Sequence, residues 1–66
     1  MLLDREKVDL AMARECITIS EFAQRYGVSR NRMNVILNSQ SITPLCAGRI
    51  AKALCVDVTE IIVVNN

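Results

Sequence analysis

The sequence predicts a small all-α domain built from five short helices. Apolar residues recur at helical spacing, capping residues precede most of these runs, and a single glycine separates two of them. Sixty-six residues suffice for one domain, expected to span residues 1–66, and the 52% apolar fraction suffices for one core. Because a chain this short buries only about 60% of its unfolded surface, we expect marginal stability without a partner.

The first predicted helix is capped by Asp4 and ends near Glu15. Val8, Ala11 and Met12 recur at helical spacing, so this side should face the core. Two further helices, joined by a tight turn, are predicted from Ile19 to Asn38. Their start and stop signals are a cap at Ser20, a stop at Gly27, where glycine enters the left-handed conformation freely, and a second cap at Ser29.

The helix that follows Ser29 has two different faces. Met33, Ile36 and Leu37 repeat at helical spacing and should be buried. The opposite face is rich in arginine and asparagine: Arg30, Asn31, Arg32, Asn34 and Asn38. Such a helix suits the DNA major groove, where arginine pairs with guanine and asparagine with adenine.

Thr43 and Pro44 predict the start of a fourth helix, which ends near residues 55–56. Its buried face is expected to contain Leu45, Ile50, Ala51 and Leu54. Gly48 weakens this helix by about 1 kcal/mol relative to alanine, which indicates close packing against another helix at that point.

Asp57 and Glu60 are spaced like a capping box and predict a short fifth helix. This helix is expected to carry Val58, Ile61 and Ile62. The β-branched tail Ile61–Val64 can instead form a short extended segment. Two roles remain open for the tail, closing the core of its own domain or entering a dimer interface.

The charged residues are unevenly distributed. From Phe22 to Val56 there is no Asp or Glu, whereas the remainder holds three basic residues against seven acids. The basic residues of the acid-free stretch are Arg25, Arg30, Arg32, Arg49 and Lys52. This asymmetry predicts one basic and one acidic face, with chance clustering as the alternative.

Several classes of protein are disfavoured. Three cysteines and no histidine argue against a disulfide framework and a metal site, and Cys16, Cys46 and Cys55 are expected to be small core or boundary residues. No apolar run is long enough to span a membrane, and the first residues lack a signal peptide's apolar core, so we expect a cytoplasmic protein. With no glycine-rich phosphate loop and no grouped carboxylates in the central region, we expect no enzyme activity, cofactor or small-molecule ligand.

The run FAQRYGVSRNRMNVILN, followed by a proline-started helix and IAKALCVDVTEII, resembles the lambda-repressor-like (Cro- and XRE-type) helix-turn-helix domain. The resemblance covers roughly Val8 to Ile62, and its unit of two helices corresponds to about residues 19–38. It implies a compact five-helix domain whose second and third helices bind DNA, with the third in the major groove.

The resemblance implies a sequence-specific DNA-binding transcriptional regulator that binds duplex DNA as a homodimer. The implied base contacts are Arg30, Asn31, Asn34 and Val35. The implied backbone contacts are Thr18, Ser20, Ser29, Arg32, Asn38, Ser39, Gln40, Ser41 and Thr43. A protein-interaction module or an antitoxin-type partner protein is the alternative, because helix-turn-helix folds also serve these roles.

The chain departs from the family pattern at three places. Ile19 stands where many members carry a phosphate-binding glutamine, which leaves Thr18 or Ser20 as substitutes. An apolar pair replaces the ion pair that often links the first and third helices, at little or no cost in stability. Ser39 and Cys55 stand where turn glycines are often found, so those turns can differ in shape.

Overall fold

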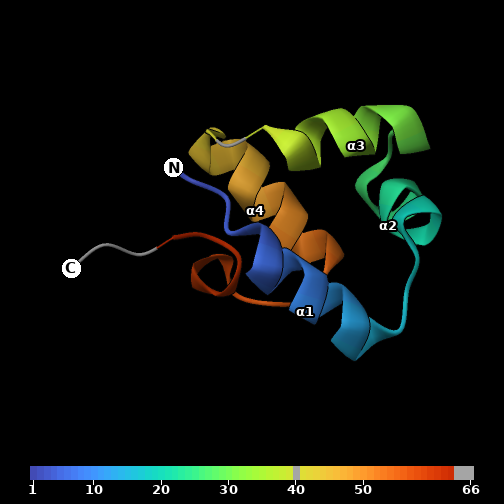
Figure 1. The fold of residues 1–66 in the computed structure, drawn as a ribbon, viewed down its shortest axis with the longest axis horizontal. Helices are drawn as coiled ribbons and strands as arrows, with labels where there is room; N and C mark the ends of the chain where they lie inside the picture. Colours follow the sequence, from blue (N-terminus) through green and yellow to red (C-terminus); the bar gives the residue numbers. More distant parts are fainter. Residues whose placement is uncertain (40, 64–66) are drawn as a thin grey trace.

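The structure, a computed structural model, describes residues 1–39 and 41–63. These residues form four α-helices and one turn of 3-10 helix around a hydrophobic core (Figure 1). The elements are α1 (Arg5–Glu15), α2 (Ile19–Tyr26), α3 (Arg30–Asn38), α4 (Pro44–Ala53) and η1 (Val58–Glu60). The all-α prediction is confirmed. The prediction of five helices is wrong, because the residues after Asp57 form only the single 3-10 turn η1, which ends before Ile61 and Ile62.

Each α-helix begins after a side chain that accepts the backbone N–H three residues later. Three of these caps are the predicted ones, Asp4, Ser29 and Thr43. The prediction for α2 is wrong: Thr18 is the cap, α2 begins at Ile19, and Ser20 lies inside the first turn. Thr18 has an extended backbone and Glu21 follows three residues later, so the two side chains close a reciprocal capping box.

Three helices are followed by a residue in the left-handed conformation, either at the C-cap or one residue after it. Gly27 has φ 97° and ends α2 as predicted. Cys16 (φ 54°) follows α1 and Cys55 (φ 58°) follows α4, a conformation that costs about 1–2 kcal/mol for a residue with a side chain. Both are exposed, so the expectation of core or boundary cysteines is wrong for these two and holds for the half-buried Cys46.

The buried face of α4 differs from the prediction at one position. Leu45 is 67% exposed, and Ala47 is fully buried in its place. Ala47, Ile50, Ala51 and Leu54 follow one helical stripe, whereas Leu45 precedes Ala47 by two residues, about 200° around the helix. A large apolar residue is therefore left in solvent at the start of α4.

Gly48 lies on the exposed side of α4. A Cβ at this position would have no atom of another element within 4 Å, so the predicted close packing at Gly48 is wrong. The end of α4 also differs, since the helix stops at Ala53, short of the predicted residues 55–56. Leu54, the C-cap, is nevertheless fully buried, so the core stripe continues past the last helical residue.

Apolar side chains from all four α-helices and from the chain around them meet in the core. The buried members are Val8, Ala11, Met12, Phe22, Ala23, Met33, Leu37, Ile42, Ala47, Ile50, Ala51, Leu54 and Ile61. Ile17 and Ile36 are half-buried against this cluster. The predicted inner faces of α1 and α3 are therefore confirmed.

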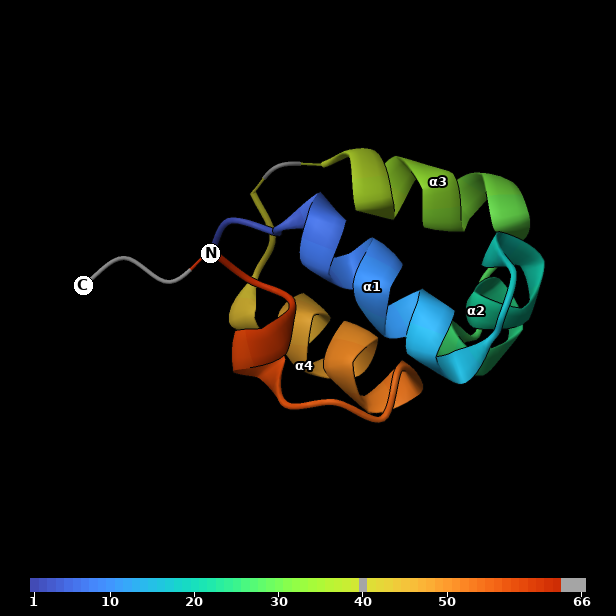
Figure 2. The same cartoon turned by 60° about the horizontal axis from the view of Figure 1, so that its bottom comes forward.

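Three chain segments far apart in the sequence close one end of the domain (Figure 2). Residues 1–3 lie between the loop before α4 and the chain after η1. Leu2 pairs with Ser41 and Leu3 pairs with Ile62, both in antiparallel fashion. These isolated pairs are too short to form a sheet. They bond the N-terminal residues to the loop before α4 on one side and to the chain after η1 on the other.

After η1 the tail does not continue as a helix. It pairs with the N-terminal residues instead. The Asp4 N–H donates to the Ile61 carbonyl, and the Val63 N–H donates to the Leu2 carbonyl, both at 2.9 Å. Ile61 is fully buried. At this residue the tail closes the core of its own domain, one of the two predicted roles. Val64 lies outside the described residues.

Candidate nucleic-acid interface

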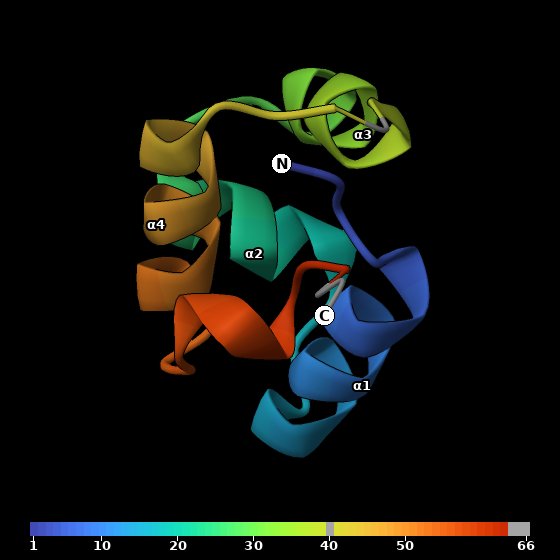
Figure 3. The same cartoon turned by 90° about the vertical axis from the view of Figure 1, so that its left-hand side faces the viewer.

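The α3 helix lies along one side of the domain, across from η1 (Figures 1 and 3). Its main helical partner is α2. The turn between them is closed by the N–H groups of Gly27 and Val28, which donate to the Ala23 carbonyl at 2.8 and 3.0 Å. Met33 and Leu37 anchor α3 to the core, which leaves its other sides facing outward.

The four predicted base-reading residues occupy different places on α3. Met33 marks the buried side, and Asn31 and Val35 fall on the opposite side, where Val35 is 58% exposed. Asn34 is half-buried on the flank. Arg30 precedes Met33 by one turn on the inner side, and it is exposed because it stands at the N-terminal end of α3. Asn31 and Val35 therefore lie in the middle of the outer face.

The start of α3 carries an unusual charge. The positive end of a helix dipole favours acids. Glu21 occupies this position in α2, and in α1 the cap Asp4 and Glu6 balance Arg5 and Lys7. The first turn of α3 instead contains Arg30 and Arg32 and no acid. Neither arginine forms an ion pair within residues 1–39 and 41–63. Helix dipole and side chains together make this end strongly attractive to anions.

The hydroxyl groups of the predicted backbone contacts differ in availability. Ser29 and Thr43 accept a backbone N–H as caps, at 3.1 and 3.2 Å, and can still donate their hydroxyl protons. The Thr18 hydroxyl instead donates to Glu21 Oε1 at 3.2 Å, and a nearby carboxylate disfavours phosphate. Ser39 donates to a backbone carbonyl at 3.1 Å. Ser29 and Thr43 are therefore the better phosphate donors.

A hollow of about 350 Å³ joins the outer face of α3 to the start of α4. Its lining includes Arg32, Val35, Ile36, Ser39, Ser41, Ile42, Thr43 and Cys46, among them five of the predicted DNA contacts. The remaining predicted contacts Ser20 and Asn38 are exposed, and Gln40 lies outside the described residues. The sequence prediction missed Leu45, whose exposure follows from the helical stripe that begins at Ala47.

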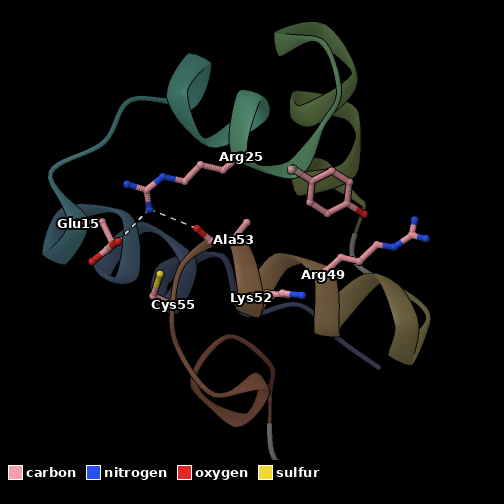
Figure 4. Close-up of a pocket in the computed structure, with 7 residues that line it drawn as sticks. Glu15, Arg25, Arg49, Lys52, Ala53 and Cys55 are labelled. Carbon is pink, nitrogen blue, oxygen red and sulfur yellow. Dashed lines mark hydrogen bonds and ion pairs between the residues drawn. The ribbon is translucent and has the colours of Figure 1, made fainter.

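The cations of the acid-free stretch do not form one face. Arg25 donates from Nη1 to Glu15 Oε1 at 2.8 Å and to the Ala53 carbonyl at 3.3 Å (Figure 4). The hydrogen bond to Glu15 raises the pKa of Arg25 above its ordinary value. Arg25, Arg49 and Lys52 line a second, larger hollow of about 580 Å³. The predicted single basic face is thus divided between α3 and this hollow. The charge of Arg25 is balanced by the carboxylate of Glu15.

The larger hollow has a structural explanation. Three helices end beside it, at Glu15, Tyr26 and Ala53, and the negative ends of their dipoles favour nearby cations. The Tyr26 hydroxyl contacts Cys46 Sγ at 3.5 Å, and this contact and partial burial raise the pKa of Tyr26, with Arg49 opposing them. We therefore assign the cations of this hollow to the stability of the fold and place the candidate interface on α3.

No protein-family model, curated protein or solved structure matches this chain. Function is therefore inferred from its own residues. Within the described part of the chain, no helix has the length and apolar character needed to cross a membrane.

Proposed function

We propose that the protein is a sequence-specific DNA-binding transcriptional regulator whose α3 enters the major groove of duplex DNA. One observation carries the proposal: α3 begins with two arginines, Arg30 and Arg32, that oppose the helix dipole and have no ion-pair partner among the described residues. This arrangement lowers the stability of the isolated helix. An external polyanion would compensate it.

The outer face of α3 supports reading of bases. Asn31 stands centrally and can bind adenine through its amide, and Val35 beside it can contact a thymine methyl group. Arg30, at the end of the helix, can reach a guanine at the edge of the site, and Asn34 on the flank has less freedom to do so. Each good bidentate contact discriminates against the wrong base by about 1–3 kcal/mol.

Phosphate contacts are proposed on both sides of this face. Arg32 and the hydroxyls of Ser29 and Thr43 would bind the backbone directly. At the start of α4, Pro44 has no N–H and Thr43 already bonds two of the next N–H groups, so the α4 terminus offers a phosphate little more than the Leu45 N–H. Most of the phosphate binding therefore falls on α3 and its cap.

A selection from random duplexes, followed by affinity measurements against salt, tests the proposal. The logarithm of affinity falls with the logarithm of salt by about 0.9 per neutralised phosphate. A slope near −2 is expected when Arg30 and Arg32 act alone, and about −4.5 when all five cations of the acid-free stretch contribute. Weak binding with a flat salt response would exclude DNA as the ligand.

Two matched variants test which arginines contribute to the salt dependence of DNA affinity. Arg32→Gln should reduce its magnitude by about 0.9, because one phosphate contact is lost. Arg25→Gln should leave it unchanged, since Arg25 already binds Glu15. A reduced slope in Arg25→Gln together with an unchanged slope in Arg32→Gln would place the DNA on the larger hollow and not on α3.

The proposed regulator is a cytoplasmic homodimer, with two α3 helices reading half-sites about 34 Å apart. A selected sequence with two-fold symmetry would support this arrangement, whereas a single undivided site would contradict it.

A protein-interaction module, including an antitoxin-type partner, is the second candidate. One observation favours it: Val35, which is 58% exposed, lines the smaller hollow, and Leu45, which is 67% exposed, lies in the sequence between the lining residues Thr43 and Cys46. Exposed apolar side chains around a recess are typical of protein-binding surfaces. Failure of the DNA selection, together with loss of partner binding in Leu45→Ser, would favour this candidate.

A further inference from the structure

The outer face of α1 carries an exposed leucine beside a recess. Leu10 is 57% exposed. The recess, of about 360 Å³, lies between α1 and η1, and its lining includes Lys7, Leu10, Ala11, Arg14, Thr59 and Glu60. A projecting apolar side chain and a recess on the same surface are the two parts that a two-fold, self-complementary interface requires.

The charges around Leu10 are also self-complementary. Glu6 precedes Leu10 by four residues and Arg14 follows it by four residues, so all three lie on neighbouring turns of one side of α1. When two such helices cross antiparallel at Leu10, Glu6 of each copy faces Arg14 of the other. Arg14 already contacts Glu60 at 3.0 Å, yet its side chain remains 64% exposed and can accept a second carboxylate.

We propose that this face of α1 binds the same face of a second copy of the chain, with Leu10 of each copy in the recess of the other. The contact does not depend on DNA binding. Because the recess lies between α1 and η1, and η1 lies across the domain from α3, the contact leaves the outer face of α3 uncovered (Figures 1 and 3). Two other described recesses have exposed apolar side chains in their lining, Val35 in one and Leu2 with Val63 in the other. Both lack this pairing of opposite charges, since the charged residue that lines the first is Arg32 and the one that lines the second is Arg5.

The interface is small. The eleven residues of α1 extend about 16 Å, and stable complexes bury about 800 Å² on each partner. We therefore expect a weak dimer that forms at high protein concentration and is favoured when two copies share one DNA molecule, which raises their effective concentration.

Sedimentation equilibrium of the full chain without DNA tests the contact. Leu10→Glu should weaken self-association by about tenfold or more, because a charge replaces the central apolar side chain. Leu45→Glu is the matched control, an equally drastic change at an equally exposed leucine, and should leave self-association unchanged. The reverse result, or a wild-type chain that stays monomeric up to its solubility limit, would overturn the proposal.

A charge exchange tests the antiparallel arrangement itself. Glu6→Arg alone and Arg14→Glu alone should each weaken association, because each places like charges opposite each other in the dimer. A mixture of the two variants should associate again, since both facing pairs then have opposite charges. A mixture no tighter than either variant would overturn the arrangement, and circular dichroism of each variant excludes unfolding as the cause.

Discussion

The two helices joined at Gly27, α2 and α3, place their charges in opposite ways. In α2 Glu21 stands in the first turn and Arg25 in the last, as the helix dipole favours. In α3 two arginines stand in the first turn, and the last turn has no basic residue. The contrast separates charges that stabilise the fold from charges that are free for a ligand. Substitutions on the two sides should therefore have different consequences.

The largest expected effect lies on the side that holds the fold together. Ile61→Ala should lower the free energy of unfolding by about 2–5 kcal/mol, because it leaves a cavity where a fully buried side chain anchors the tail. Urea denaturation measures this loss. The DNA preference of the molecules that remain folded should not change.

Ile61→Val is the graded control for this prediction. Removing one methylene from a buried isoleucine typically costs about 0.5–1.5 kcal/mol. If Ile61→Ala costs no more than Ile61→Val, the tail does not depend on this anchor. The tail would then be available for the dimer interface that the sequence left open.

The next effect lies on α3. Arg30→Ala should reduce discrimination at one base pair by about 1–3 kcal/mol, measured by competition between the selected duplex and single-base variants. Its unfolding free energy should not fall, because the side chain is exposed and opposes the helix dipole. Arg5→Ala, which removes an exposed arginine paired with Asp9 on α1, should leave base preference unchanged. An unaltered preference in Arg30→Ala would remove Arg30 from the reading surface.

The features that sequence predicted well are local. Three helix caps, the stop at Gly27 and the inner faces of α1 and α3 each depend on residues within about one or two turns. The miss at Ser20 is also local, since Thr18 and Ser20 are both good caps. The reciprocal spacing of Thr18 and Glu21 is the signal that identifies the correct one.

The features that sequence missed depend on tertiary packing. The exposure of Leu45 is set by the rotation of α4 on the core, and size and hydrophobicity alone favoured burial. Arg25 counted as a free cation until the fold brought Glu15 of α1 to within 2.8 Å of it. In the candidate interface, the identity of the exposed α3 residues was predictable. Two other facts could be learned only from the structure. Arg30 stands at the N-terminal end of α3, and the Thr18 hydroxyl already donates to Glu21.

A smaller effect on stability is expected when an acid replaces an arginine in the first turn of α3, as in α2. Arg32→Glu puts an acid three residues after the Ser29 cap, the spacing at which Thr18 and Glu21 close a capping box in α2. It should raise the unfolding free energy by about 0.3–1 kcal/mol and at the same time abolish DNA binding. Arg32→Gln preserves the capping geometry without the negative charge and should weaken binding less. A variant that is stabilised and still binds DNA would show that Arg32 faces no phosphate.

The smallest effect concerns acids on the side that stabilises the fold. Hydrogen bonds from the Thr59 N–H and hydroxyl lower the pKa of Asp57, and those from the Asp57 N–H and Arg14 lower the pKa of Glu60. Because both folded pKa values lie below the unfolded ones, their stabilisation is present above the unfolded pKa values of about 4 and is lost as pH falls through the folded values.

Unfolding measured from neutral pH to below pH ~3 should therefore show stability falling through the acid range. In Asp57→Asn with Glu60→Gln this fall should be shallower, because neither group then binds a proton on unfolding. Glu6→Gln, which removes one exposed carboxylate from the start of α1, serves as the control for the loss of negative charge alone. If the double variant follows the wild-type pH profile, the carboxylates at η1 do not couple protonation to folding.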